Sequence, residues 1–229
     1  MQMGVTMNEF LHISSESKLI DENLKEQLKT VLDKLTKEIY LVSIVDEKNI
    51  KCIEMVSFLK SFSSINCKIH LEMYEKGENT YVEDTLKCEG MLPVVGLYNS
   101  EKEYTGISFF GIPGGKELNS FVLAIYNVAS IGQAIDKKLT KRILRLKQKF
   151  NIGVCVSLAC HYCADTVSAY QRIASLNPNI EAAMIDATLY PELIEKYKLE
   201  RVPVAIINEK ECIVGGKSIE EIIDILEKF

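Results

Sequence analysis

The sequence lacks the features of a membrane protein, a nucleic-acid-binding protein or an exported protein. Its 229 residues carry a net charge of −5, which argues against nucleic acid or an anionic membrane as the main partner. No apolar run approaches the roughly 18 residues that a membrane-spanning helix needs. The first residues lack the basic start and apolar core of a signal peptide. These absences predict a cytoplasmic protein that has no membrane partner.

Metal ligands and dinucleotide-binding loops are also scarce. Of the three histidines, His12 and His70 have no partner at the spacing of metal ligands. No Gly-x-Gly-x-x-Gly motif follows a strand-like run, so we expect the chain to bind neither flavin nor NAD(P)H. The seven cysteines show no disulfide-framework spacing, which suits a reducing cytoplasm. Most are interpreted as small hydrophobic residues: Cys52, Cys67, Cys88, Cys155 and Cys212.

One pair of cysteines stands apart. The motif Cys160-His161-Tyr162-Cys163 follows the strand-like run 154–158 and opens an amphipathic, helix-like segment at 164–176. A strand, a Cys-x-x-Cys pair and a helix in this order are typical of a thiol–disulfide exchange site. The helix N-terminus favours a thiolate at the first sulfur, and the second lies about one turn further on. We predict that Cys160 is the nucleophile and that the more buried Cys163 resolves the mixed disulfide.

The chain repeats its own pattern. The runs 41–45 and 154–158 share Val-Ser followed by Ile or Leu, and helix-like apolar spacing follows each run. Each half then has a proline that opens a β-rich run, and a glycine pair before a last amphipathic helix. This order predicts an α/β fold with helices around a mixed parallel and antiparallel sheet. We predict two fused thioredoxin-like folds, 19–131 and 132–229, after an N-terminal extension, 1–18.

The two predicted folds differ at the cysteine pair. Alignment of the strand-like runs places Asp46 opposite Cys160, and Asn49 opposite Cys163. The first fold therefore has no thiol pair at the corresponding place. We expect only the second fold to carry redox chemistry.

The motif and its surroundings resemble a known family. Residues 157–167 resemble the N-terminal domain of the F subunit of bacterial alkyl hydroperoxide reductase, which is two fused thioredoxin-like folds with a single Cys-His-x-Cys. Other segments agree in order, namely 24–37, 110–118, 175–178, 185–186 and 202–203. Ala164 replaces the family's proline after the second cysteine, and Lys116 replaces a histidine. The family's flavin and nucleotide domains are missing from this sequence, so the resemblance implies a stand-alone dithiol protein.

The resemblance also implies roles for residues away from the cysteine pair. Pro203 matches the cis proline that faces the dithiol in thioredoxin-like folds, which would let the Val202 backbone pair with an extended substrate. Its alternative is an edge-strand proline. Glu117 matches a glutamate near the dithiol that could take the proton of the resolving thiol. Its alternative is a charge that favours a helix N-terminus.

The two residues between the cysteines are also candidate site residues. His161 could favour the Cys160 thiolate because imidazole titrates near neutrality, or it could only face solvent and shape a docking surface. We assign Tyr162 to substrate docking.

The predicted function is protein-disulfide reduction. Electrons would pass from a separate thioredoxin-reductase-like flavoprotein, which holds the FAD and NAD(P)H, to a peroxiredoxin or similar disulfide protein. One alternative is a general glutaredoxin-like or disulfide-isomerase-like oxidoreductase, which its redox potential would distinguish. Another is a non-catalytic adaptor, whose thiols would have an unperturbed pKa.

Overall fold

The computed structural model describes residue 10 and residues 12–229. The remaining residues of the predicted N-terminal extension, 1–9 and 11, lie outside the described part. Phe10 and Ile13 are buried, and Lys60 Nζ donates hydrogen bonds to their carbonyl oxygens. Phe10 and Ile13 therefore anchor the described part of the extension to the protein.

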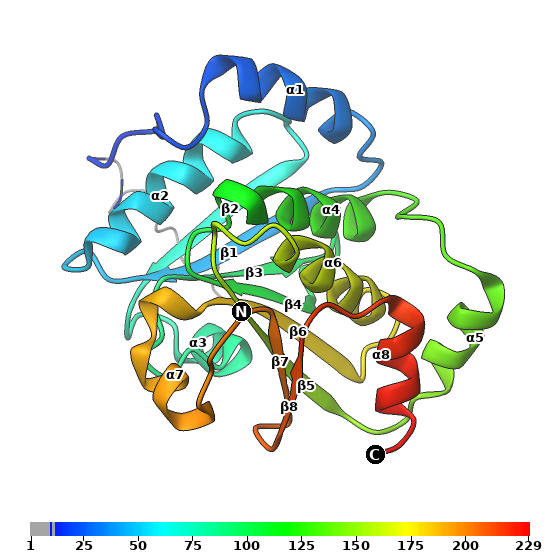
Figure 1. Cartoon of the computed structure of the whole chain (residues 1–229). Coiled ribbons are helices and arrows are strands. Elements are labelled where there is room, and N and C mark those ends of the chain that lie inside the picture. The colour runs from blue at the N-terminus through cyan, green and yellow to red at the C-terminus, as the bar shows by residue number, and fades with distance from the viewer. Residues whose placement is uncertain (1–9, 11) are drawn as a thin grey trace.

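One eight-stranded sheet runs through the described part of the chain, in the order β2-β1-β3-β4-β6-β5-β7-β8 (Figure 1). Its strands are β1 Ile39–Val45, β2 Ile69–Glu75, β3 Val94–Tyr98, β4 Tyr104–Phe110, β5 Phe150–Val156, β6 Ile180–Asp186, β7 Val204–Ile207 and β8 Glu211–Val214. The helices are α1 Glu22–Leu32, α2 Ile50–Ser63, α3 Thr80–Leu86, η1 Gly115–Glu117, α4 Leu118–Ala129, α5 Lys137–Arg145, α6 Cys163–Ala174, η2 Ala187–Leu189, α7 Pro191–Tyr197 and α8 Ile219–Leu226.

The two halves of the sheet have the same topology. In the first half, β1 pairs in parallel with β2 and antiparallel with β3, and β3 continues antiparallel to β4. In the second half, β5, β6, β7 and β8 repeat this arrangement. The halves join through the parallel pair β4 and β6. The predicted fold class, two fused thioredoxin-like folds in a mixed sheet, is confirmed, and the limits 19–131 and 132–229 stay predictions.

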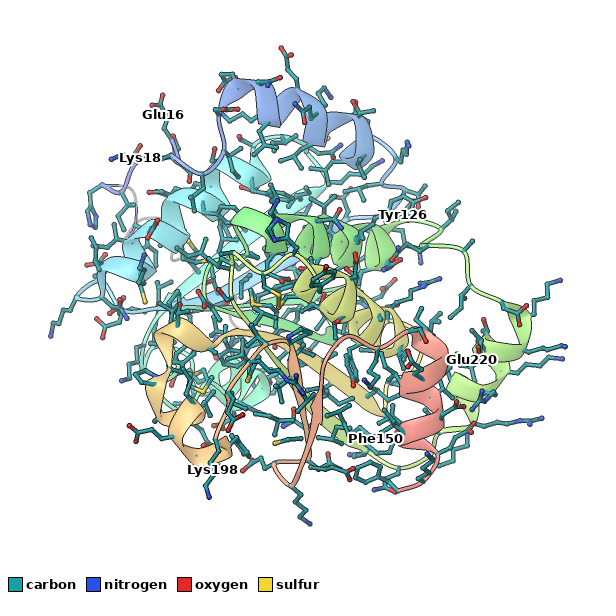
Figure 2. The ribbon with its side chains drawn as sticks, in the orientation of Figure 1. Glu16, Lys18, Tyr126, Phe150, Lys198 and Glu220 are labelled. Atoms are coloured by element: carbon teal, nitrogen blue, oxygen red, sulfur yellow. A yellow bond between two sulfur atoms is a disulfide. The ribbon has the colours of Figure 1, made fainter. Side chains whose placement is uncertain are left out.

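Helices cover both faces of the sheet (Figure 1). Alternate strand residues point to opposite faces, so that Val154 and Val156 join one hydrophobic core and Cys155 joins the other. The first core is closed by α1, α2, α4, α6 and α8. At its edge lies Phe150, at the start of β5 (Figure 2), and its ring meets that of Phe229 edge-on. The second core is closed mainly by α3 and α7.

The sheet register corrects the alignment of the two halves. Ile44 pairs with Val94, and Cys155 pairs with Val204, each directly after the proline of its half. Ile44 therefore corresponds to Cys155, and Asp46 corresponds to Ser157. The predicted match of Asp46 with Cys160 is wrong, because the loop before α2 has four residues (46–49) and the loop before α6 has six (157–162). The longer loop in the second half is the one that contains Cys160.

Candidate active site

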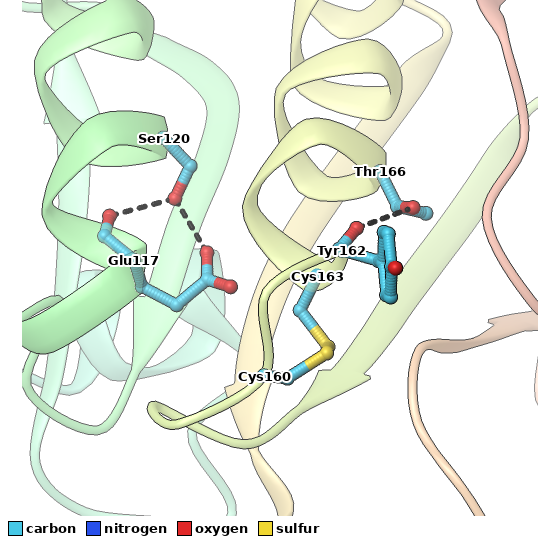
Figure 3. The surroundings of a disulfide bond; sticks show 6 residues. All are labelled: Glu117, Ser120, Cys160, Tyr162, Cys163 and Thr166. Atoms are coloured by element: carbon cyan, nitrogen blue, oxygen red, sulfur yellow. Dashed lines mark hydrogen bonds between the residues drawn. A yellow bond between two sulfur atoms is a disulfide. The ribbon is translucent and has the colours of Figure 1, made fainter.

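A disulfide bond joins Cys160 to Cys163 at the start of α6 (Figure 3). The Cα atoms are 5.6 Å apart, a separation that a disulfide spans without movement of the backbone. Cys160 lies in the turn before the helix, where its N–H donates to the Ser157 carbonyl oxygen over 2.9 Å. Cys163 is the first residue of α6. The motif forms a closed turn between β5 and α6.

The two cysteines differ in their access to solvent. Cys163 is fully buried, and Cys160 is half-buried. His161 is exposed, and the side chain of Tyr162 is 76% exposed. The prediction that Cys163 is the more buried cysteine is confirmed. A protein partner can therefore approach Cys160 across the exposed turn, while Cys163 stays behind it.

The N-terminus of α6 has no side-chain cap. Tyr162 occupies the N-cap position and makes no capping hydrogen bond. In the first half, Asn49 caps the corresponding helix α2, and its side chain accepts from the Lys51 N–H over 2.9 Å. The free N–H groups at a helix N-terminus carry partial positive charge. In α6 they remain available to stabilise a thiolate beside them.

Glu117 comes from the first half and lies in the surroundings of the disulfide (Figure 3). The Lys116 N–H donates to the carbonyl oxygen of Leu158 over 3.1 Å, which holds η1 against the loop before α6. Gly115 permits this contact, because its φ of +56° is unfavourable for other residues and an added Cβ would lie 3.0 Å from the same oxygen. The resemblance predicted a glutamate near the dithiol; Glu117 lies on the α4 side of its surroundings (Figure 3), and its role toward the sulfurs stays a prediction.

The carboxyl group of Glu117 is held in an unusual environment. Its side chain is fully buried, and Oε2 accepts a hydrogen bond of 2.6 Å from Ser120 Oγ. The pKa of Glu117 is raised from 4.5 to about 7: burial raises it most, the Ser120 hydrogen bond lowers it, and the negative charges of Asp165 and Asp186 raise it. Glu117 makes no capping hydrogen bond to α4. A carboxyl group with this pKa can accept or release a proton near neutral pH.

Val202 and Pro203 lie just before β7. The peptide bond between them is cis, as the resemblance implies. Pro203 is buried, and its carbonyl oxygen accepts from the Gly215 N–H over 2.9 Å. Val202 is partly buried against the hydrophobic core that contains Cys163 and borders Cys160. The docking role of both residues stays a prediction.

His161 and Ser120 are the two site residues for which the sequence-based expectation and the structure differ in content. His161 is exposed and, within the described residues, makes no hydrogen bond or ion pair, so its predicted effect on Cys160 stays a prediction. Ser120 was missed, although it holds the carboxyl group of Glu117. Its spacing of three residues after Glu117 within a helix was the signal that could have identified it.

The other cysteines are free thiols. Cys52, Cys88 and Cys155 are buried, and burial raises the pKa of Cys52 to about 11 and that of Cys155 to about 12, so both stay protonated and unreactive at neutral pH. Cys67 and Cys212 are exposed, and the interpretation of Cys67 as a structural residue stays a prediction.

The part of the chain that the structure describes holds neither a metal centre nor a membrane span. There, no three His, Cys, Asp or Glu side chains gather as metal ligands would. None of the helices described is long and apolar enough to cross a membrane.

Comparisons with known proteins agree with this geometry. Residues 150–227 match the family model of the thioredoxin domain. The solved NTD_N/C domain of alkylhydroperoxide reductase AhpF from Enterococcus faecalis is 43% identical, with a TM-score of 0.87 over 90% of this chain and 99% of that one. The F subunit of alkyl hydroperoxide reductase in Pseudomonas aeruginosa is 29% identical over 208 residues. A protein disulfide oxidoreductase from Aeropyrum pernix, 19% identical with a TM-score of 0.82 over 90% of this chain and 92% of that one, shares the fold.

This chain covers only part of the length of the curated proteins that it matches. The match to the Pseudomonas aeruginosa protein covers 90% of this chain and 37% of that protein. Another curated relative, an NADH dehydrogenase of Bacillus subtilis, is also covered over 37% of its length. The chain thus corresponds to somewhat more than a third of these proteins.

Proposed function

Since the chain belongs to the family of the N-terminal domain of AhpF, the F subunit of alkyl hydroperoxide reductase, we propose that it is a thiol–disulfide oxidoreductase whose reactive dithiol is Cys160 and Cys163. The observation that carries this proposal is the disulfide between these residues at the uncapped start of α6. Half-buried Cys160 is the nucleophile, and buried Cys163 is the resolving thiol.

The reduced dithiol reacts in two steps. The Cys160 thiolate attacks one sulfur of the partner's disulfide and forms a mixed disulfide, while the other partner sulfur leaves as a thiolate and takes a proton from solvent. Cys163 then loses its proton and attacks the sulfur of Cys160. The Cys160–Cys163 disulfide forms, and the first partner sulfur leaves. Two electrons have passed from the dithiol to the partner.

Glu117 is the proton acceptor for Cys163 in the second step. The pKa of its buried carboxyl group, about 7, lies close to neutral pH, which is where a general base works best. Its hydrogen bond with Ser120 fixes the carboxyl group on the α4 side of the disulfide (Figure 3). The first half, which has no reactive cysteine pair at its own helix, in this way supplies the base for the second half.

The partner docks around the exposed turn. Tyr162 offers a large exposed ring beside the sulfurs, and the partly buried Val202, next to Pro203, borders the same core. An extended segment of the partner would pair with the Val202 backbone, as in strand addition. His161 lies on the same exposed turn and contributes to the docking surface or favours the Cys160 thiolate.

We place this dithiol between a thioredoxin-reductase-like flavoprotein, which supplies electrons from NAD(P)H through FAD, and a peroxiredoxin. The relative that supports this order is AhpF, by its name a part of an alkyl hydroperoxide reductase. We propose that the protein acts in the cytoplasm. Its two thioredoxin-like folds extend over 19–131 and 132–229.

A reconstituted turnover assay tests the proposal. The chain is mixed with a thioredoxin reductase, NADPH and a peroxiredoxin, and peroxide-dependent loss of NADPH is followed. Cys160→Ser should abolish turnover, whereas Cys67→Ser, which replaces an exposed free cysteine, should leave it unchanged. Full activity of Cys160→Ser would refute the mechanism.

The range of disulfide proteins that the chain reduces distinguishes a general oxidoreductase from a dedicated one. Turnover with many unrelated disulfide proteins at similar kcat/KM would favour a glutaredoxin-like role over a dedicated peroxide pathway. A standard potential near −120 mV, which is about that of a strong disulfide donor, would favour oxidation of partners instead of their reduction.

A further inference from the structure

Polar side chains are buried between the two helices that flank the candidate site. Helix α4 contributes Ser120 and Asn127, and α6 contributes Ser168, Gln171 and Arg172. Each of these side chains is less than one-tenth exposed. Helices packed inside a core of this kind usually face one another with apolar residues. This interface therefore needs a separate explanation.

Several of these polar groups have no partner. Among the described residues, Ser168 Oγ, Arg172 Nε, Glu117 Oε1 and both amide atoms of Gln171 make no hydrogen bond. A buried polar atom left unpaired costs about 1–3 kcal/mol. Such groups in folded proteins are usually paired with internal water where no protein group reaches them. Their concentration in one interface points to water at that place.

The polar groups form a row that leads away from Glu117. Helices α4 and α6 lie side by side and begin at the same end, α4 directly after Glu117 and α6 at Cys163 (Figure 1). At the other end, an Arg172 NH group donates to the Gln133 carbonyl oxygen over 2.6 Å. Gln133 in turn exchanges two hydrogen bonds with Asn127, of 2.9 and 2.7 Å. These hydrogen bonds mark one end of the helix pair, and those between Ser120 and Glu117 mark the other.

The far end of the row reaches solvent. Asn127 lines an open cavity of about 390 Å³ together with Ala174 and Ser175, at the last turns of α4 and α6. The helical rise from Ser120 to Asn127 is about 10 Å. Three or four water molecules at ordinary hydrogen-bond spacing span about that distance.

We propose that a file of internal water molecules lies between α4 and α6, bound by Ser168 and Gln171, and that it connects the carboxyl group of Glu117 to solvent at Asn127. Its use as a proton path rests on the proposed function. In that reaction a docked partner covers the turn at Cys160, so a proton that Glu117 has taken from Cys163 cannot leave at the front. It leaves along the water file to bulk solvent, and no electron moves with it.

The charged groups at the two ends of this path differ in sign, with acidic groups near Glu117 and a basic group at the far end. Asp165 on α6 and Asp186 at the end of β6 act on Glu117, and both stabilise its protonated form. The basic group at the other end is Arg172, which is fixed by Gln133 and by Ser175 Oγ at 3.3 Å. Glu117 thus holds the proton at the dithiol until the path delivers it to solvent.

The test uses the oxidised full chain and two variants, Ser168→Ala and Gln171→Leu. The control is Ser61→Ala, which removes another buried and unpaired hydroxyl on α2. The pKa of Glu117 is measured by carboxyl carbon NMR, and water positions come from crystals of each protein at high resolution. Ordered water should contact Ser168 and Gln171 in the parent protein.

In Gln171→Leu the water should be lost, and the pKa of Glu117 should rise by about one pH unit because its charged form is less hydrated. Ser168→Ala should give a smaller change in the same direction, and Ser61→Ala should give none. With a disulfide partner present, Gln171→Leu should slow the resolving step severalfold at pH 7. The initial attack by Cys160 should be unchanged.

Two results would overturn the proposal. One is a dry interface, in which Ser168 and Gln171 pair with protein groups alone. The other is a pKa of Glu117 that is the same in the parent and in the variants. If Gln171→Leu does not fold, Ser168→Ala decides the question. Neither readout requires turnover, so failure of the reductase assay and failure of the water path are separate outcomes.

Discussion

Replacement of Glu117 by glutamine should stabilise the protein, and more so as the pH rises. The carboxyl group is fully buried, and its burial raises the pKa from 4.5 to about 7. A carboxyl group with a raised folded-state pKa binds its proton more tightly in the folded protein than in the unfolded chain. Its contribution to stability is present below the unfolded pKa and is lost as the pH rises through the folded pKa.

The size of the effect follows from the pKa. A change from 4.5 to about 7 corresponds to a penalty of about 3 kcal/mol for the ionised group at pH 9, and about 1 kcal/mol at pH 5. Glu117→Gln has nearly the same shape and does not ionise. We therefore expect it to exceed the parent in unfolding free energy by about 3 kcal/mol at pH 9, and by about 1 kcal/mol at pH 5.

Urea unfolding of the oxidised proteins at pH 5 and pH 9 measures this difference. The matched control is Glu195→Gln on α7, which changes an exposed glutamate in the same way. It should alter stability equally at both pH values. A Glu117→Gln effect that is independent of pH, or a parent protein that is relatively more stable at pH 9, would refute the account of the buried carboxyl group.

The remaining predictions concern the reaction and the first half. Cys163→Ser should accumulate a mixed disulfide between Cys160 and its partner, visible on non-reducing gels, and absence of this species would contradict the assigned order of attack. Tyr162→Ala should raise the KM for a protein partner several-fold but leave the reduction of a small aromatic disulfide unchanged. The control is Tyr81→Ala, which removes an exposed tyrosine on α3, and equal effects of the two variants would exclude docking at the turn. Asn49→Ala should lower the unfolding free energy by about 1 kcal/mol through loss of the α2 cap, without a change in turnover, and loss of activity would show that the first half takes a different part in the reaction.

The sequence predicted the elements whose signals are local. The strand, the cysteine pair and the helix at 154–176 could be read from hydrophobic spacing, and the structure places them at β5 and α6. The internal repeat predicted the topology of both halves, because each half carries the same order of apolar runs, prolines and glycine pairs. Hydrophobic spacing, prolines and glycine pairs report helices, strands and turns, and these elements depend mainly on residues that are close together in the chain.

Features that depend on the meeting of distant segments could not be predicted in this way. Glu117 and Cys163 are far apart in the chain, and only the family resemblance brought them together. The alignment of Asp46 with Cys160 failed because similar strand residues, Val-Ser-Ile and Val-Ser-Leu, do not report the length of the loop that follows. The buried polar side chains of α6, such as Gln171, had the composition of a solvated helix face, and only the packing of α4 against them shows that they are inside.

The position of Glu117 makes the two halves dependent on each other. The sulfurs belong to one half and the carboxyl group to the other, so a fragment that begins at α5 would keep the disulfide and lose the group beside it. A duplicated copy that has no reactive pair of its own would ordinarily be free to decay. If Glu117 serves the neighbouring sulfurs as proposed, deletion of either copy alone would remove one of the groups that the site needs.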